Sequence, residues 1–471
     1  MVGKGFERLS AQDSSFVIFE GLGSHIHVTA TAVFELGPLL ASQGGLDMQR
    51  VRAHIGSRLH LLPHYRKKLA YTFLQRHCIW VDDPRFDLAY HVRHTALPRP
   101  GGDEELKEIT GRIASQPLER DRPLWEIWFV EGLAGDRFAA VAKVHHSLVD
   151  GVSGVGVLTS LLSPTAETTI ARAPKWKPQP PPGILDFLGD GVSRSAEFSV
   201  SVARTLIDAV ASPRAAIDNV AEGAGAAWET LSGGLTRPAK TPINQPIGGQ
   251  RRIDWKDLDL AEVRDIRKRL NGSINDVVLT IVSGAVRRLL RRRRVSLKGL
   301  DFRITVPVDI RDGEADLGVQ NKVSSWFLSL PIAQRDPKRR FERIRAQTRR
   351  LKALNAARGI DLFMRLADAS GSTLLPSGLV AIVSILNPYN MIVSNIRGPE
   401  FPLYLLGARL TEFHAHLPLF ENQGLAVAAM SYLDKIHLGL TGDWDLMPDL
   451  AEFARDLDAA ASELREVADG S

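Results

Sequence analysis

The chain has 471 residues, of which 44% are hydrophobic and 24% are charged, so it is long enough for two hydrophobic cores of ordinary size. Its 59 basic and 54 acidic side chains give a net charge of +5, and no nucleic-acid-binding motif is recognisable, so the composition does not indicate nucleic-acid binding. Cys78 is the only cysteine, which excludes an intrachain disulfide. Its setting, QRHCIWVDD, favours a half-buried strand residue over a nucleophile.

No apolar stretch approaches the roughly 20 residues that span a bilayer. The N-terminal segment MVGKGFERLS lacks the apolar core of a signal peptide. These two features predict a cytoplasmic protein. Peripheral placement on the inner face of the plasma membrane or on lipid inclusions is an open alternative.

Two strands and a helix are predicted around residue 145. Residues 125–131 (WEIWFVE) and 137–144 (RFAAVAKV) are typical of strands, and Gly135-Asp136 supplies a turn between them. After residue 151 the run VSGVGVLTSLL has apolar residues at helical spacing. Strand, short turn and helix would hold the intervening residues at the edge of a cleft.

The intervening residues, HHSLVDG, have the composition of a general-base site. They include His145, His146, Asp150 and Gly151. A neutral imidazole, with an ordinary pKa of about 6.5, accepts a proton near neutral pH, and a nearby carboxylate helps to fix its surroundings. A histidine pair alone would more simply be a chance feature of a loop, but the complete pattern favours a catalytic role.

Proline-rich and amphipathic segments occupy the middle of the chain. Residues 174–183 (PKWKPQPPPG) predict a stiff extended linker. From 184 to about 231, apolar residues recur every three or four positions and indicate one or two amphipathic helices. These helices either pack back on the protein or lie on a membrane. Residues 233–249 predict a second loop.

A further helix is expected from about Ser273 to Arg291. Ser273 and Asp276 have the spacing of a capping arrangement, and apolar residues follow at helical spacing. The helix ends in arginines, whose positive charges interact favourably with the negative end of the helix dipole. They form either a solvated face or a contact with ligand phosphates or anionic lipid.

The HHxxxDG pattern resembles the active-site signature of the coenzyme-A-dependent acyltransferase superfamily, which includes chloramphenicol acetyltransferase and peptide-synthetase condensation domains. Within it, the chain most resembles the bacterial wax ester synthase/diacylglycerol acyltransferase family, in its actinobacterial branch. The resemblance covers almost the whole chain, through six further blocks in the family's order: RLSAQDSSFVIFE, RFDLAYHVR, RPLWEIWFVEGL, INDVVLTIVSGAVRRLL, VPVDIR and VSNIRGPEFPLYLLGARL.

The sequence departs from the family pattern in two places. The family usually has proline and methionine before the histidine-valine of its first block, whereas this chain has His25-Ile26-His27-Val28. Arg397 stands where the family commonly has a proline in SNVPGP. Neither departure touches the histidine motif, but both leave the acceptor preference open.

The resemblance implies an α/β protein with two chloramphenicol-acetyltransferase-like domains, mixed sheets flanked by helices, and an active site at the domain interface. The expected division is an N-terminal acyltransferase domain (1–165), a connector (166–250) and a C-terminal acyltransferase domain (251–471). Alternating strand-like and helix-like runs agree with the α/β class.

The resemblance also implies roles for single residues. His146 is the expected general base, while His145 and Asp150 organise its loop, with Gly151 closing the motif. A backbone N–H or a hydroxyl is expected to stabilise the tetrahedral oxyanion, and the sequence does not identify it.

Three residues of the second half are expected near the site without a role in proton transfer. Asn275 and Asp276 match the family's second signature, although helix capping explains part of that pattern. Arg311 is the expected partner of Asp150, with Arg122 and Arg303 as alternatives. No metal ligand is predicted.

The implied reaction moves a long-chain acyl group from acyl-CoA to diacylglycerol or to a long-chain alcohol, giving triacylglycerol or wax ester. Acyl-CoA would be a co-substrate, and no permanently bound cofactor is expected. Two rival functions stay open. One is a condensation-like acyltransferase that uses a carrier-protein thioester, and the other is a non-catalytic protein that binds lipid surfaces.

Overall fold

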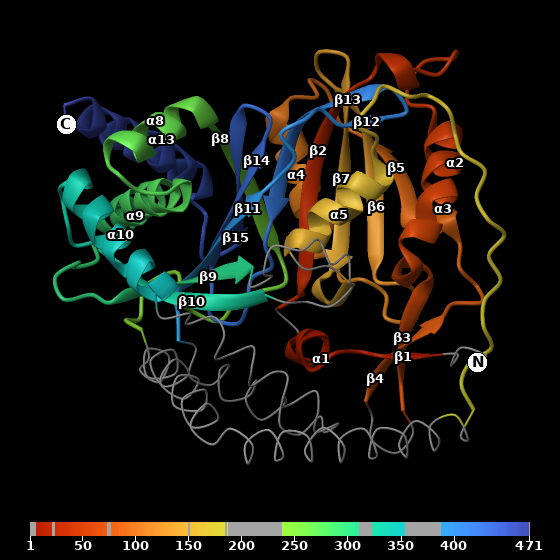
Figure 1. Ribbon diagram of the computed structural model, residues 1–471, viewed down its shortest axis with the longest axis horizontal. Helices are drawn as coiled ribbons and strands as arrows, with labels where there is room; N and C mark the ends of the chain where they lie inside the picture. Colours follow the sequence, from red (N-terminus) through yellow and green to blue (C-terminus); the bar gives the residue numbers. More distant parts are fainter. Residues whose placement is uncertain are drawn as a thin grey trace, which may run out of the picture.

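A computed structural model describes residues 6–20, 24–72, 77–148, 151–183, 186, 238–309, 323–353 and 388–470 (Figure 1). The predicted amphipathic segment at 184–231, apart from residue 186, lies outside these ranges. Among the helices within them, none combines the length and apolarity needed to cross a bilayer.

The described residues up to 183 form most of one six-stranded sheet, a small three-stranded sheet and five α-helices. The strands are β1 (Glu7–Arg8), β2 (His27–Glu35), β3 (Lys67–Tyr71), β4 (Cys78–Asp82), β5 (Val92–Ala96), β6 (Trp125–Leu133) and β7 (Arg137–His145). The helices are α1 (Ala11–Phe19), α2 (Met48–Arg58), α3 (Leu88–His91), α4 (Asp103–Ser115) and α5 (Gly151–Leu161). The short 3-10 turns are η1 (Gly37–Leu39), η2 (Leu59–Leu61), η3 (Pro63–Arg66) and η4 (His146–Leu148).

The predicted strands around residue 135 are confirmed as β6 and β7, which pair antiparallel. The turn between them has positive φ at Gly135 (78°) and Asp136 (52°), conformations that glycine and aspartate tolerate best. The predicted helix after the histidine motif is confirmed as α5.

Cys78 lies in β4, within the small sheet of order β1-β4-β3. It is buried, and burial raises the pKa of its thiol to about 11. A protonated, buried thiol is a poor nucleophile, as expected.

The second half forms another six-stranded sheet, covered on its outer side by helices (Figure 1). The strands of this sheet are β8 (Arg251–Asp259), β9 (Phe302–Asp309), β10 (Val323–Leu330), β11 (Met391–Arg397), β14 (Leu425–Tyr432) and β15 (Lys435–Asp443). The second half also contains β12 (Tyr404–Leu405) and β13 (Ala408–His416), which lie in the other six-stranded sheet. Its helices are α8 (Leu260–Arg269), α9 (Ile274–Arg292), α10 (Pro337–Ala353) and α13 (Leu450–Asp469).

Both large sheets are mixed. We call β12-β13-β2-β7-β6-β5 the first sheet and β10-β9-β11-β14-β15-β8 the second sheet. β5 is parallel to β6 in the first sheet, and β11 is parallel to β9 and β14 in the second. Mixed sheets flanked by helices agree with the predicted α/β class.

Two strands from the second half of the chain complete the first sheet. β13 pairs antiparallel with β2, so that His416 lies opposite Thr29. β13 also packs closely on the second sheet: an added Cβ at Gly439 in β15 would lie 1.8 Å from the carbonyl oxygen of Ala415. The two sheets therefore meet along β13, a feature that the sequence pattern did not predict.

Helix α9 begins as the sequence predicted. The hydroxyl of Ser273 accepts the backbone N–H of Asp276 (3.2 Å), and the carboxylate of Asp276 accepts the N–H of Ser273 (2.8 Å). The apolar face of the helix is buried against the second sheet, α10 and α13. Two arginines of its last turns pair with carboxylates of α13, namely Arg288 with Glu463 and Arg292 with Asp456. Arg293, directly after the helix, pairs with Asp449, directly before α13.

Residues 174–183, the predicted proline-rich linker, form neither helix nor strand. This segment runs along the first half of the molecule, where the N–H of Gln179 donates to Asp82 (2.9 Å) and Arg66 stacks on Trp176.

Candidate active site

The backbone of the histidine motif is fixed on both sides. β7 ends at His145, whose N–H donates to the carbonyl of Leu124 (3.0 Å). The N–H of His146 then donates to the carbonyl of Ile26, just before β2 (2.9 Å). Nearby, the hydroxyl of Ser24 donates to the carbonyl of Leu419 (2.8 Å). The motif therefore lies where the segment before β2 meets the second half of the chain.

The imidazole of His146 is half-buried. It stacks on the ring of Phe16 in α1, with a centroid distance of 4.2 Å and an interplanar angle of 30°. The position of α1 is fixed at its N-terminus, where the side chain of Ser10 accepts the N–H of Asp13 (3.0 Å). The first block of the family resemblance thus supplies the helix against which the predicted base packs.

His145 faces into the protein and is uncharged near neutral pH. Its Nδ1 accepts the backbone N–H of Ser147 (3.2 Å) and lies 2.7 Å from the Ser147 hydroxyl. This leaves the ring proton on Nε2, which lies 4.0 Å from Oε2 of Glu20. Burial is the main reason that the pKa of His145 falls to about 3, and the neighbouring His27 lowers it further.

A carboxylate that the sequence reasoning missed anchors this cluster. Oε1 of Glu20 lies 3.2 Å from Nε2 of His27, and the guanidinium of Arg120 donates to its Oε2. Burial by itself would raise the pKa of Glu20, but the contact with His27, the charge interaction with His145 and the hydrogen bonds from Arg120 lower it to about 2.

The strand register brings this cluster together, because His27 in β2 lies directly opposite His145 in β7. The sequence signal for this cluster is the His25-Ile26-His27-Val28 stretch, which departs from the family pattern and does not by itself identify Glu20 or His145 as partners.

Two of the predicted site residues are not among the described residues. Asp150 and Arg311 lie outside the described ranges, so their predicted pairing stays a prediction. Gly151 is the first residue of α5. Of the alternative arginines, Arg122 pairs with Glu119 (3.2 Å) and Arg303 with Asp301 (2.7 Å).

The two residues of the family's second signature, Asn275 and Asp276, lie in different surroundings. Oδ1 of Asn275 lies 3.4 Å from Nδ2 of Asn395 in β11. This contact joins the block INDVVLTIVSGAVRRLL to the block VSNIRGPEFPLYLLGARL. Asp276 is buried and caps α9, and its Oδ1 accepts the hydroxyl of Thr348 (2.7 Å). These contacts explain Asp276 as a structural residue.

Family models match both halves of the chain. The wax ester synthase/diacylglycerol acyltransferase catalytic domain matches residues 9–278, and the C-terminal domain of the same family matches residues 319–465. A Mycobacterium tuberculosis protein with a diacylglycerol O-acyltransferase name is 34% identical over 98% of this chain and 91% of its own. The O-acyltransferase WSD of Acinetobacter baylyi is 30% identical over 82% of each chain.

Solved structures show the same fold. The wax ester synthase/diacylglycerol acyltransferase from Marinobacter aquaeolei VT8 matches with a TM-score of 0.67 and 24% identity, over 98% of this chain and 100% of that one. The first condensation domain of the calcium-dependent antibiotic synthetase matches with a TM-score of 0.62 and 15% identity, over 98% and 97%. These matches confirm the predicted fold class. The chain belongs to the wax ester synthase/diacylglycerol acyltransferase family and is an acyltransferase.

Proposed function

We propose that this protein transfers a long-chain acyl group from acyl-CoA to the hydroxyl of diacylglycerol or of a long-chain alcohol, with His146 as the general base. The observation that carries the proposal is the contrast between the two adjacent histidines. His145 is enclosed and held by Ser147 and Glu20, whereas His146 is only half-buried, with its backbone and ring positioned by Ile26 and Phe16. A fixed imidazole at the edge of the fold suits proton transfer with a substrate.

In the proposed reaction, His146 takes the proton from the acceptor hydroxyl while the hydroxyl oxygen attacks the thioester carbonyl. The tetrahedral intermediate collapses, the carbon–sulfur bond breaks, and the coenzyme A thiolate leaves. The thiolate recovers the proton from the imidazolium. A thioester is already activated, so neither a covalent acyl-enzyme nor a permanently bound cofactor is needed.

We assign His145 and Glu20 as positioning residues. His145 fixes the turn through Ser147, and it is uncharged near neutral pH, so it places no positive charge beside the base. Asp150 and Gly151 keep their predicted part in loop organisation, and Asn275 its place near the site.

We also propose that the enzyme works in the cytoplasm at a lipid surface, since its acceptors dissolve in lipid. Flotation of the purified protein with anionic phospholipid vesicles tests this placement. Protein that stays at the bottom of the gradient at low ionic strength would contradict it.

The central test is a product assay in which palmitoyl-CoA is offered with both hexadecanol and diacylglycerol, measuring ester and released thiol. We expect ester formation by the wild type and a loss of about 10²- to 10⁴-fold in rate for His146→Ala. His94→Ala is a matched control. His94 is partly exposed and lies in β5 of the first sheet, the sheet that also contains β7, the strand before His146. A wild-type rate in His146→Ala would exclude the general-base role. Activity only with a carrier-protein thioester would favour the condensation-like alternative.

A further inference from the structure

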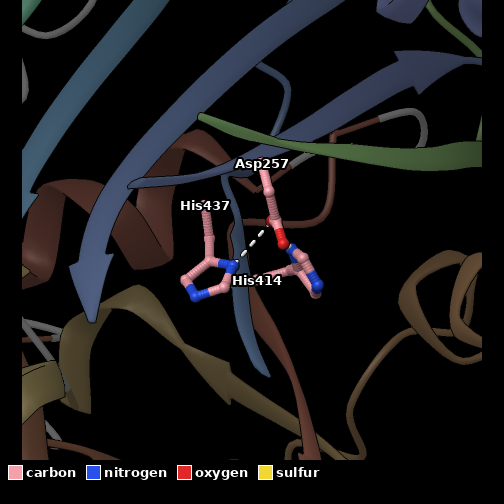
Figure 2. Close-up of side chains that lie close together, drawn as sticks. All are labelled: Asp257, His414 and His437. Atoms are coloured by element: carbon pink, nitrogen blue, oxygen red, sulfur yellow. Dashed lines mark hydrogen bonds and ion pairs between the residues drawn. The ribbon is translucent and has the colours of Figure 1, made fainter. Parts of the chain in front are cut away.

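A cluster of two histidines and one aspartate lies outside the HHxxxDG motif, where the two large sheets meet. It consists of Asp257 in β8, His437 in β15 and His414 in β13 (Figure 2). β8 and β15 belong to the second sheet, whereas β13 belongs to the first. The group therefore links the two sheets.

The ligand-type atoms of these three side chains converge. Nδ1 of His437 lies 2.7 Å from Oδ1 of Asp257, and Nδ1 of His414 lies 3.9 Å from the same oxygen. One nitrogen or oxygen atom from each residue lies within 4.8 Å of the others. Figure 2 shows both rings turned toward the carboxylate.

The orientation of His414 leaves an unsatisfied acceptor in this space. Its side chain is 0% exposed, and its Nε2 faces Oε2 of Glu412 at 3.3 Å, which places the ring proton on Nε2. Glu412 is itself held by Arg137 (3.1 Å). Nδ1 of His414 is then a lone pair without a hydrogen-bond partner, and it faces the carboxylate of Asp257.

Nδ1 of His414 and the carboxylate of Asp257 are both acceptors, and two acceptors that face each other repel unless a proton or a cation lies between them. A carboxylate that accepts the far ring N–H of a histidine is the usual outer support of a metal-binding imidazole. Glu412 has this relation to His414. Both observations point to a cation as the missing partner.

We propose that Asp257, His414 and His437 bind one divalent transition-metal ion, with Zn²⁺ the best match. Two imidazole nitrogens and one carboxylate oxygen form a donor set that zinc accepts, with water as a fourth ligand. A tetrahedral zinc site holds its donors at about 2.0 to 2.2 Å, so the side chains must close by small rotations. His437 would bind the ion through Nδ1 as a neutral imidazole, so the proton that Nδ1 now donates to Asp257 would move to Nε2.

The other contacts of Asp257 are compatible with ion binding. Lys435 contacts the other carboxylate oxygen, Oδ2 of Asp257 (3.1 Å), so Oδ1 can still face the metal. Asp257 is 27% exposed while both histidines are buried, which gives the ion a route from the Asp257 side. An ion bound by these three residues would link β13 to β8 and β15. The sequence predicted no metal ligand, and these three residues have no motif spacing.

The test uses the full, untagged chain after treatment with a chelator. Zn²⁺ is titrated by calorimetry, and Co²⁺ serves as a spectroscopic probe, because a tetrahedral Co²⁺ site absorbs strongly in the visible range. We expect one equivalent per chain, a visible Co²⁺ band and a higher melting temperature with metal. His414→Gln and His437→Gln should each weaken binding at least tenfold and abolish the band.

His64→Gln is the matched control. His64 contacts the carboxylate of Glu7 (2.8 Å), which Lys67 also contacts (2.9 Å), so it shares the histidine, carboxylate and lysine arrangement without a second histidine. This variant should bind Zn²⁺ as the wild type does.

Two further variants distinguish the loss of a metal ligand from misfolding. Asp257→Asn preserves side-chain volume and should also lose binding, and Glu412→Gln should weaken it about 10- to 100-fold. Circular dichroism checks the fold of each variant. Absence of a stoichiometric site in the wild type, or equal affinity in the wild type and in all folded ligand variants, would overturn the proposal. The readout is metal binding, so it is independent of acyl transfer.

Discussion

Replacing Glu20 with glutamine removes the negative charge that His27, His145 and Arg120 surround. The Glu20 side chain is 12% exposed, and a pKa lowered from 4.5 to about 2 corresponds to about 3 kcal/mol in favour of the ionised form. The guanidinium of Arg120 is half exposed, so solvent screens part of this attraction, and the imidazole of His145 is uncharged at pH 7 and adds no charge attraction there. We therefore expect Glu20→Gln to lower the free energy of unfolding by about 1 to 2 kcal/mol at pH 7.

The effect should depend on pH in a defined direction. The pKa of Glu20 in the folded protein lies below its ordinary value, so its contribution is complete above about pH 4.5 and is lost as the pH falls toward 2. Urea unfolding followed by tryptophan fluorescence should show the full difference between wild type and variant at pH 7. The difference should be smaller at about pH 3.5.

Glu7→Gln is the control for this experiment. The hydrogen bond with His64, followed by the contacts with Lys67, lowers the pKa of Glu7 to about 2 as well, even though burial opposes the shift. However, its side chain is 50% exposed, so its loss should cost less than about 1 kcal/mol. Equal losses in the two variants, or a Glu20→Gln cost that does not shrink on acidification, would contradict the role assigned to burial.

Further outcomes follow from packing. Phe16→Ala removes the ring beside His146, and we expect kcat to fall about two- to tenfold, since such aromatic contacts contribute about 0.5 to 1.5 kcal/mol; steady-state kinetics with an unchanged kcat would contradict this. Gly439→Ala would push a methyl group into the carbonyl of Ala415, and urea unfolding should show a loss of about 3 kcal/mol or more. Gly156→Ala meets no atom within 4 Å in α5 and should instead stabilise the protein by about 0.5 to 1 kcal/mol.

Local patterns predicted the elements around the histidine motif well. Alternation and turn residues located β6 and β7, and the spacing of Ser273 and Asp276 located the start of α9. These features depend on neighbours in the chain, which a single sequence displays directly.

Contacts between distant segments could not be predicted in the same way. The cluster of Glu20, His27 and His145 depends on the β2–β7 register, and the group of Asp257, His414 and His437 depends on three strands from two sheets. No local periodicity records such pairings. The role of His146, in contrast, was inferred from resemblance and stays a prediction to be tested by substitution.

The pairing of β13 with β2 affects how the protein is made. The ribosome synthesises β2 early, but its neighbour β13 follows much later. Thr411 of β13, whose hydroxyl donates to the carbonyl of Val33 in β2, comes 378 positions after that residue. Until β13 has been synthesised, one edge of β2 has no partner strand, and an unpaired strand edge can pair with other chains. Synthesis speed and chaperone supply, more than final stability, should therefore limit the yield of this enzyme in a foreign host.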